Sequence, residues 1–210
     1  ARADWFISAL HQVPARSSLA GCEGSLATGS KSSGYDDEPG IQQCAEVTRS
    51  IHTSGKPYLG VCFGHQMMGH ALGGRVAKSP NGWGIGVHTF AVEKTESWMD
   101  PPAAKFNLIM SCQDQVLELP PGSQVLAVNH HCPVGMFRIG NMLGGPGHPE
   151  FTPACAASLL HLRRDRFGAG NADKALATLG QPLDRVLLAH WTRRFLQTAA
   201  GPAGENREGI

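Results

Sequence analysis

The stretch KPYLGVCFGHQMMGHALGG, residues 56–74, constrains the fold of this chain more than any other segment. Residues 57–61 form a short apolar run of the kind found in strands that are covered on both faces of a sheet. A run with helical character follows almost at once, so a strand here would pass directly into a helix. Strand and helix patterns alternate on this scale along the chain, which predicts an α/β fold with a mainly parallel sheet flanked by helices.

Other segments continue the alternation. Apolar residues recur at helical spacing over residues 40–54, 153–166 and 183–198, and a shorter helix is predicted near residues 4–13. Strands are predicted over residues 25–29, within 82–94 and 100–111, on both sides of the Pro-Pro-Gly turn in 114–129, and twice within 136–147. We expect the apolar stripe of the last helix to lie in the core; it consists of Leu183, Leu187, Trp191 and Phe195.

Length and charge limit the classes of function. A chain of 210 residues can bury one sizeable core, so residues 1–200 are predicted to form a single domain, followed by a flexible tail at 201–210. The net charge of +1 gives no electrostatic reason to expect nucleic acid or a membrane surface as a partner. No apolar run is long enough to span a bilayer. Six cysteines without regular spacing indicate reduced thiols and hence a cytoplasmic protein.

Cys62 stands between Gly60 and Gly64 at the junction of the predicted strand and helix. A nucleophile on such a turn adopts a strained backbone conformation that lifts its side chain clear of the sheet, and small residues on either side let the backbone segments approach. The helix N-terminus favours thiolate over thiol, and the backbone N–H of Phe63 is a natural oxyanion donor. The same residues could form a turn around an inert, buried cysteine, and the pattern alone favours neither interpretation.

A cysteine nucleophile needs a base, and the segment GHPEFTP at residues 147–153 offers one. His148 and Glu150 are separated by Pro149, a spacing that in an extended segment lets both side chains approach one locale. A carboxylate beside an imidazole fixes its tautomer and supports its protonated form. Alone, this segment would be interpreted as a surface loop before a helix, but together with the Cys62 turn it indicates a catalytic site.

Five segments, taken in order, resemble the class I glutamine amidotransferases: GVCFGHQMMGHALGG, SPNGWGIGVHTF, QDQVLELPPGS, FRIG and GHPEFTP. The similarity is greatest to the free-standing, GMP-synthase-like branch that includes γ-glutamyl peptidases, and it covers most of the chain. This resemblance implies a flavodoxin-like sheet flanked by helices and a catalytic triad of Cys62, His148 and Glu150.

In such enzymes the cysteine attacks the side-chain carboxamide of glutamine, the histidine protonates the departing ammonia, and water cleaves the γ-glutamyl thioester. The resemblance further implies oxyanion donors at Phe63, Gly29 and Ser30. It implies substrate contacts at Gln66, Ser111, Gln113 and Asp114. The substrate is then glutamine or another small γ-glutamyl compound, with no metal and no cofactor, and an amidotransferase would pass ammonia to a synthase partner.

The chain also departs from the family pattern. No strand-like run precedes Asp4, so we expect the usual first strand to be lacking and the sheet to be destabilised. Cys112 stands where the family has the histidine of Ser-His-Gln-Asp. Gly145 and Pro146 replace a β-branched residue and a glutamine, which we expect to remove a strand hydrogen bond and to displace His148.

These observations leave three functions open. The first is a glutamine amidotransferase-like hydrolase that cleaves a γ-glutamyl amide through Cys62, and the second is a γ-glutamyl peptidase with the same thioester chemistry. The third is a catalytically impaired relic or fragment with a binding role only. The segment NHHC at residues 129–132 does not predict a metal site, because adjacent histidines in an extended segment point to opposite faces. His65 and His70 are expected to have packing roles.

Overall fold

The computed structural model describes residues 21–200 of the chain. In chain order its strands are β1 (Ser25–Ala27), β2 (Tyr58–Val61), β3 (Arg75–Lys78), β4 (Gly84–Val92), β5 (Lys105–Cys112), β6 (Asp114–Glu118), β7 (Gln124–Val128), β8 (Met136–Ile139) and β9 (Met142–Gly145). Its helices are α1 (Pro39–Ser54), α2 (Phe63–Ala71), α3 (Pro153–Leu162), α4 (Arg164–Phe167), α5 (Ala169–Thr178) and α6 (Arg185–Ala199).

The main sheet has seven strands in the order β1-β2-β9-β8-β7-β4-β5. Only the β1–β2 and β2–β9 pairs are parallel, and the other neighbouring pairs are antiparallel. The prediction of a mainly parallel sheet is therefore wrong, and the sheet is mixed. The connections explain the difference: parallel neighbours need a long crossover such as the one through α1, whereas β8 turns back into β9 at Gly140 and Asn141.

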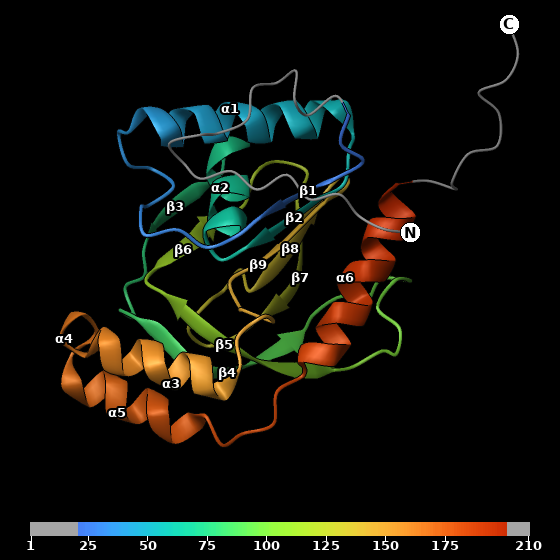
Figure 1. Ribbon diagram of the computed structural model, residues 1–210. Coiled ribbons are helices and arrows are strands. Elements are labelled where there is room, and N and C mark those ends of the chain that lie inside the picture. The colour runs from blue at the N-terminus through green and yellow to red at the C-terminus, as the bar shows by residue number, and fades with distance from the viewer. Residues whose placement is uncertain (1–20, 201–210) are drawn as a thin grey trace, which may run out of the picture.

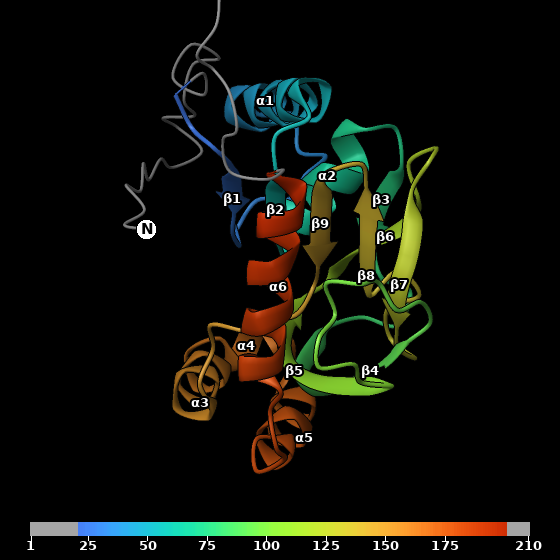
Figure 2. The ribbon, with the colours of Figure 1, turned by 90° about the vertical axis from the view of Figure 1, so that its right-hand side faces the viewer.

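Helices cover the sheet on both faces (Figures 1 and 2). On one face, Val47 and Ile51 of α1 pack in the same cluster as Tyr58 of β2 and Met142 of β9. On the other face, α6 lies across β2 and β9, where its apolar residues join a larger cluster with Val61. The two clusters bury β2 from both sides, as its continuous apolar sequence predicts.

Leu183 of the predicted stripe precedes the last helix and packs in one cluster, whereas the other three residues lie on α6 and pack in another. Trp191 and Phe195 are buried there, and Leu187 packs against the same cluster. The indole N–H of Trp191 donates to the carbonyl oxygen of Pro101 at 2.8 Å, which satisfies its polar atom within an apolar environment. Trp191 also packs edge-on against Phe106 of β5, so these contacts hold α6 against β5 and the segment that precedes it.

The helix α5 was not predicted. Its buried residues are Ala172 and Ala175, and its one large apolar residue, Leu176, is half-buried, so the apolar pattern of the helix is weak. Together with α3 and α4 it covers the far end of β4 and β5, where Ile85, Leu160 and Phe167 pack in one cluster (Figure 1). These helices are therefore held by tertiary packing rather than by a strong amphipathic pattern.

Two further predictions can be compared with the structure. The strands on either side of the Pro-Pro-Gly turn exist as β6 and β7, but β6 pairs with β3 in a separate two-stranded sheet. Pro146 follows the last residue of β9 instead of lying inside the strand, so no ladder donor is lost there. The expected absence of a first strand, the helix near residues 4–13 and the tail at 201–210 lie outside the described residues. Within those residues, β1 forms the sheet edge, with Leu26 45% exposed.

Candidate active site

Cys62 occupies a strained turn between β2 and α2. Its φ of 55° makes it the one non-glycine residue with positive φ among residues 21–200. The turn is feasible because its glycines let backbone segments touch: a Cβ on Gly60 would lie 2.6 Å from the carbonyl carbon of Gly64. A Cβ on Gly64 would overlap the carbonyl oxygen of Ala27 in β1. The strain predicted from the sequence is thus present and is held in place by packing.

The sulfur of Cys62 is buried, with the residue only 6% exposed, yet its surroundings favour the thiolate. A hydrogen bond with the Cys112 thiol lowers the pKa of Cys62, burial opposes this, and the imidazole of His148 and the backbone N–H of Phe63 lower the pKa further, to about 5. The same interaction has the opposite effect on Cys112, because it raises the pKa of the Cys112 thiol well above its usual value. Cys62 is therefore the sulfur that carries the charge.

His148 and Glu150 lie together in the segment after β9. Nδ1 of His148 contacts Oε1 of Glu150 at 2.7 Å, and the imidazole stacks on Phe151 with ring centroids 4.2 Å apart. The Nε2 atom of His148 is buried, and no group within residues 21–200 makes a well-aligned hydrogen bond with it. This atom faces the thiol of Cys62. Burial lowers the pKa of His148, but interactions with Cys62 and Glu150 outweigh it and raise that pKa to about 9.

The carboxylate completes a chain of opposite charges. Burial raises the pKa of Glu150, but hydrogen bonding to His148 and its charge outweigh burial, so the pKa is lowered overall. Arg185, at the start of α6, also contributes to this lowering and donates from Nε to the carbonyl oxygen of Pro149 at 2.7 Å. Near neutral pH, the arrangement is thiolate, imidazolium, carboxylate.

The backbone fixes His148 from two sides. Its N–H donates to the carbonyl oxygen of Ile109 in β5 at 2.8 Å, and Met110 forms an isolated antiparallel bridge with Gly147. The N–H of Cys62 in turn donates to the carbonyl oxygen of Gly145 at 2.9 Å. The expected displacement of His148 by the Gly-Pro sequence is therefore not seen, because β5 and β2 hold the segment at both ends.

The predicted oxyanion loop lies beside the imidazole. A Cβ built on Gly29 would lie 3.5 Å from Cε1 of His148, which places this residue at the site. Ser30 is exposed, and its Oγ accepts a hydrogen bond from the N–H of Ser32 at 3.1 Å. The loop that follows β1 thus reaches the site alongside the helix α2, since a Cβ on Gly34 would lie 3.8 Å from the backbone nitrogen of Met67.

The predicted substrate residues gather at the junction of β5 and β6. Gln66 of α2 is buried and donates from Nε2 to the carbonyl oxygen of Asp114 at 2.8 Å. The carbonyl oxygen of Gln113 accepts from the N–H of Ser79 at 2.8 Å. Ser111 is the half-buried residue directly before Cys112 in β5. These contacts position the junction next to α2.

Three features of the site were not predicted from the sequence. The Asp114 carboxylate accepts hydrogen bonds from the hydroxyls of Ser33, at 2.5 Å, and Tyr35, at 3.0 Å, so it anchors the loop after β1. The second feature is the contact of Cys112 with Cys62, and the third is Arg185 behind Glu150. Each joins residues far apart in sequence, and only Cys112 gave a signal, as a departure from the family pattern.

Several other histidine, methionine and tryptophan side chains lie outside the candidate active site. His65 is fully buried and packs at a tilt against Phe137, with ring centroids 5.1 Å apart, and burial lowers its pKa to about 3. Met67 and Met68 are fully buried in the core. Trp83 packs edge-on against Phe167. Within residues 21–200, no group of three or more His, Cys, Asp or Glu side chains is placed to hold a metal ion. The same residues contain no helix of the length and apolarity that crossing a bilayer requires.

Comparisons with known proteins give matches both in sequence and in fold. Residues 31–161 match the family Glutamine amidotransferase class-I. The chain is 30% identical to Gamma-glutamyl peptidase 3 of Arabidopsis thaliana, across 89% of this chain and 79% of that protein. It is 32% identical to a glutamine-hydrolyzing GMP synthase of Thermomicrobium roseum, across 65% of this chain but only 28% of the longer protein. A glutamine amidotransferase from Thermotoga maritima has the same fold, with a TM-score of 0.69 at 18% identity, covering 84% of this chain and 78% of that one.

Proposed function

This chain belongs to the class-I glutamine amidotransferase family, and on that premise we propose that it hydrolyses γ-glutamyl amide bonds through a thioester on Cys62. The observation that carries the proposal is the line of charges formed by Cys62, His148 and Glu150, with the nucleophile on a strained strand-to-helix turn. An inert structural cysteine needs neither the strain nor a buried ion pair.

The first half of the reaction forms the thioester. The Cys62 thiolate attacks the side-chain carbonyl carbon of the γ-glutamyl group, and negative charge develops on the carbonyl oxygen. The N–H of Phe63, which borders the sulfur, and the backbone of Gly29 and Ser30 are the proposed donors to that oxygen. The protonated His148 gives its proton to the departing amine or ammonia through Nε2.

The second half returns the enzyme to its starting state. Water attacks the thioester carbonyl, and neutral His148 takes its proton as a general base. Glutamate leaves, and the Cys62 thiolate and the imidazolium form again. Glu150 accepts the hydrogen bond from the Nδ1–H of His148 throughout the reaction, which keeps Nε2 directed at the reacting atoms. No step requires a group from outside the chain except the substrate and water.

The leaving group separates two versions of this activity. In a glutamine amidotransferase, ammonia leaves and passes to a synthase partner; the similarity to a domain of GMP synthase supports this version. In a γ-glutamyl peptidase, an amino acid or peptide leaves. The similarity to Gamma-glutamyl peptidase 3, which spans most of both chains, favours a γ-glutamyl peptide as the substrate.

Glutamate release tests both versions in one assay. The purified chain is given free glutamine in one series and a γ-glutamyl dipeptide in another, with Cys62→Ser as the background. We expect release from the dipeptide to exceed release from glutamine, and both to vanish in the variant. Preference for glutamine would favour the amidotransferase version. A cooperatively folded protein that releases nothing above the variant in either series would contradict the proposal and favour the non-catalytic relic.

A further inference from the structure

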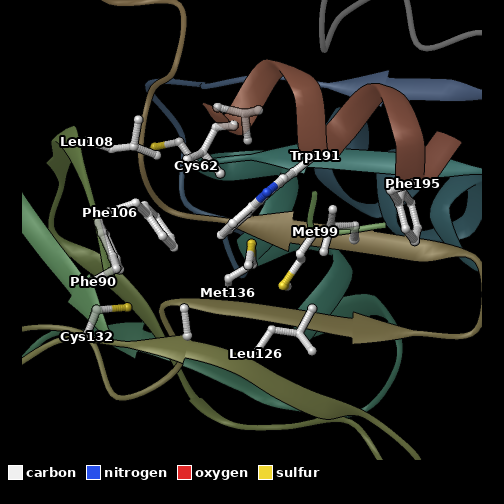
Figure 3. Packing of buried hydrophobic residues seen from close by; sticks show 14 of the residues in the cluster. Cys62, Phe90, Met99, Phe106, Leu108, Leu126, Cys132, Met136, Trp191 and Phe195 are labelled. Atoms are coloured by element: carbon white, nitrogen blue, oxygen red, sulfur yellow. The ribbon is translucent and has the colours of Figure 1, made fainter. Parts of the chain in front are cut away.

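A second cysteine faces the nucleophile from the neighbouring strand. Cys112 is the last residue of β5 and is 5% exposed. Side chains alternate along a strand, so Leu108, Met110 and Cys112 point to one face of β5, and all three belong to the cluster that contains Cys62. Figure 3 shows the Cys62 side chain directed toward Leu108 on that strand. The end of β5, which carries Cys112, lies beside the helix that follows Cys62, because Gln66 of α2 donates to the carbonyl oxygen of Asp114 at 2.8 Å.

The two thiols interact: each shifts the pKa of the other, and both residues are almost fully buried. The Cys112 sulfur also accepts a hydrogen bond from Nε2 of the buried Gln115, at 3.6 Å. The third buried cysteine of the cluster is turned elsewhere, because the Cys132 thiol donates to the carbonyl oxygen of Val134 at 3.1 Å. Cys62 and Cys112 thus form a pair from which Cys132 is excluded.

We propose that Cys62 and Cys112 form a reversible oxidation site, at which a hydroperoxide converts the two thiols into an intramolecular disulfide. The site lies on the catalytic nucleophile itself. Its occupant is a small hydroperoxide, hydrogen peroxide being the simplest, and this molecule is close in size to the water that the hydrolysis requires. The proposal does not need a γ-glutamyl substrate, although its effect on activity depends on the proposed function.

The chemistry proceeds in two balanced steps. The Cys62 thiolate attacks one oxygen of the hydroperoxide, the O–O bond breaks, and the sulfur becomes a sulfenic acid while hydroxide leaves and is protonated to water. Cys112 then loses its proton and attacks the Cys62 sulfur, so that the S–S bond forms, the S–O bond breaks, and a second water leaves. In total two thiols give up two electrons and hydrogen peroxide accepts them. A dithiol reductant reverses the change by thiol–disulfide exchange.

The charge distribution of the pair suits these roles. Attack on peroxide requires a thiolate, and the thiolate is on Cys62, where the Cys112 hydrogen bond and the His148 imidazolium stabilise it. Cys112 remains a neutral thiol until the sulfenic acid has removed that negative charge. To form the bond, the two sulfurs must approach to about 2.05 Å, which requires a shift at the end of β5.

Oxidation would switch the hydrolase off without destroying it. The disulfide removes the nucleophile, and its formation competes with further oxidation of Cys62 to the irreversible sulfinic acid. A chain with histidine at position 112 could not form this bond. The residue that departs from the family pattern is therefore the residue that protects the nucleophile.

Peptide mapping by mass spectrometry tests the proposal independently of activity. The folded full chain is treated with hydrogen peroxide, unreacted thiols are blocked, and the protein is digested with trypsin and then with a protease that cleaves before aspartate. The second cleavage, before Asp114, is needed because trypsin alone leaves Cys112 and Cys132 on one peptide. We expect a linked pair of peptides that contain Cys62 and Cys112, lighter by about 2 Da than the two reduced peptides together. Dithiothreitol should release both peptides and restore glutamate release where activity was present beforehand.

Two variants separate this bond from other oxidations. Cys132→Ser should keep the link, since Cys132 takes no part. In Cys112→Ser and Cys112→Ala, Cys62 should instead gain about 32 Da as sulfinic acid, and dithiothreitol should not reverse it. A link between Cys112 and Cys132, or sulfinic acid at Cys62 in the natural chain as fast as in both Cys112 variants, would overturn the proposal. Failure of glutamate release alone would count against the hydrolase and leave the mapping result intact.

Discussion

The site has two sides that are built differently. The turn that carries Cys62 is part of the core: its sulfur is buried, and Gly60 and Gly64 pack backbone against backbone. The facing loop after β1 is largely exposed and is held by two hydroxyl groups, those of Ser33 and Tyr35, that donate to Asp114. Packing thus fixes the nucleophile, and hydrogen bonds hold the side expected to receive the oxyanion.

This difference has a consequence for tolerance to change. A close-packed turn cannot absorb an added methyl group, because the neighbouring backbone has no room to move. A loop anchored by side-chain hydrogen bonds can lose one of them and keep its overall course at a cost of about 1 kcal/mol. Substitutions on the Cys62 side should therefore affect folding or abolish activity, whereas substitutions on the loop side should weaken catalysis by degrees.

The largest effect is expected from the nucleophile. Cys62→Ser should lower glutamate release by at least about 1,000-fold, because the hydroxyl is not ionised by the surroundings that ionise the thiol. Cys155→Ser, at an exposed thiol on α3, is the matched control and should leave the rate unchanged. Equal rates for the two variants would mean that Cys62 is not the nucleophile.

The second expected effect is on stability. Gly64→Ala places a methyl group against the carbonyl oxygen of Ala27 and should lower the free energy of unfolding by about 2–3 kcal/mol, measured by thermal or urea denaturation. Gly170→Ala in α5 is the control, because nothing lies within 4 Å of the added carbon. Its stability should stay the same or rise slightly, since alanine favours the helix. Similar stability of both variants would show that the turn is not close-packed.

The third expected effect is a bell-shaped dependence of kcat/KM on pH. The thiolate forms as pH rises through the pKa of Cys62, about 5, so activity should rise there. The imidazolium is lost as pH rises through the pKa of His148, about 9, so activity should fall there. Beyond either limit kcat/KM should drop about tenfold per pH unit. The rate of iodoacetamide alkylation of Cys62 should show the lower step, and a single step near the usual thiol value of about 8.5 would argue against the ion pair.

The smallest expected effect is at the anchor of the loop. Asp114→Asn leaves a weaker acceptor for Ser33 and Tyr35 and should lower kcat/KM by about tenfold, with unfolding little changed. Glu118→Gln, on the same strand but in an exposed ion pair with Arg75, should change neither quantity. A loss of global stability in Asp114→Asn would show that the loop belongs to the core after all.

The sequence predicted the parts of the site that are local. The apolar run before Cys62 and the glycines around it act over a few residues, so pattern alone placed Cys62 on a turn. The spacing of His148 and Glu150 predicted that their side chains meet, but the extended segment expected there is a turn, closed by the N–H of Phe151 donating to the carbonyl oxygen of His148. The resemblance to a known family predicted Gly29 as an oxyanion donor, and the structure places this residue beside the imidazole.

Long-range features could not be predicted in the same way. Strand direction depends on which strands become neighbours, so the antiparallel half of the sheet was missed. The helix α5 has only a weak apolar pattern, formed by Ala172, Ala175 and Leu176, two of which are small. The contact between Cys62 and Cys112 depends on the end of β5 lying beside the turn after β2, which no local pattern encodes.

Trapping the covalent intermediate tests the central claim most directly. The natural chain is mixed with a γ-glutamyl dipeptide, quenched in acid within the first turnovers, digested, and analysed by mass spectrometry. We predict that the peptide containing Cys62 carries one γ-glutamyl group, that hydroxylamine removes it, and that Cys62→Ser lacks it. Glutamate release with no adduct at Cys62, or with the adduct on another residue, would contradict the account.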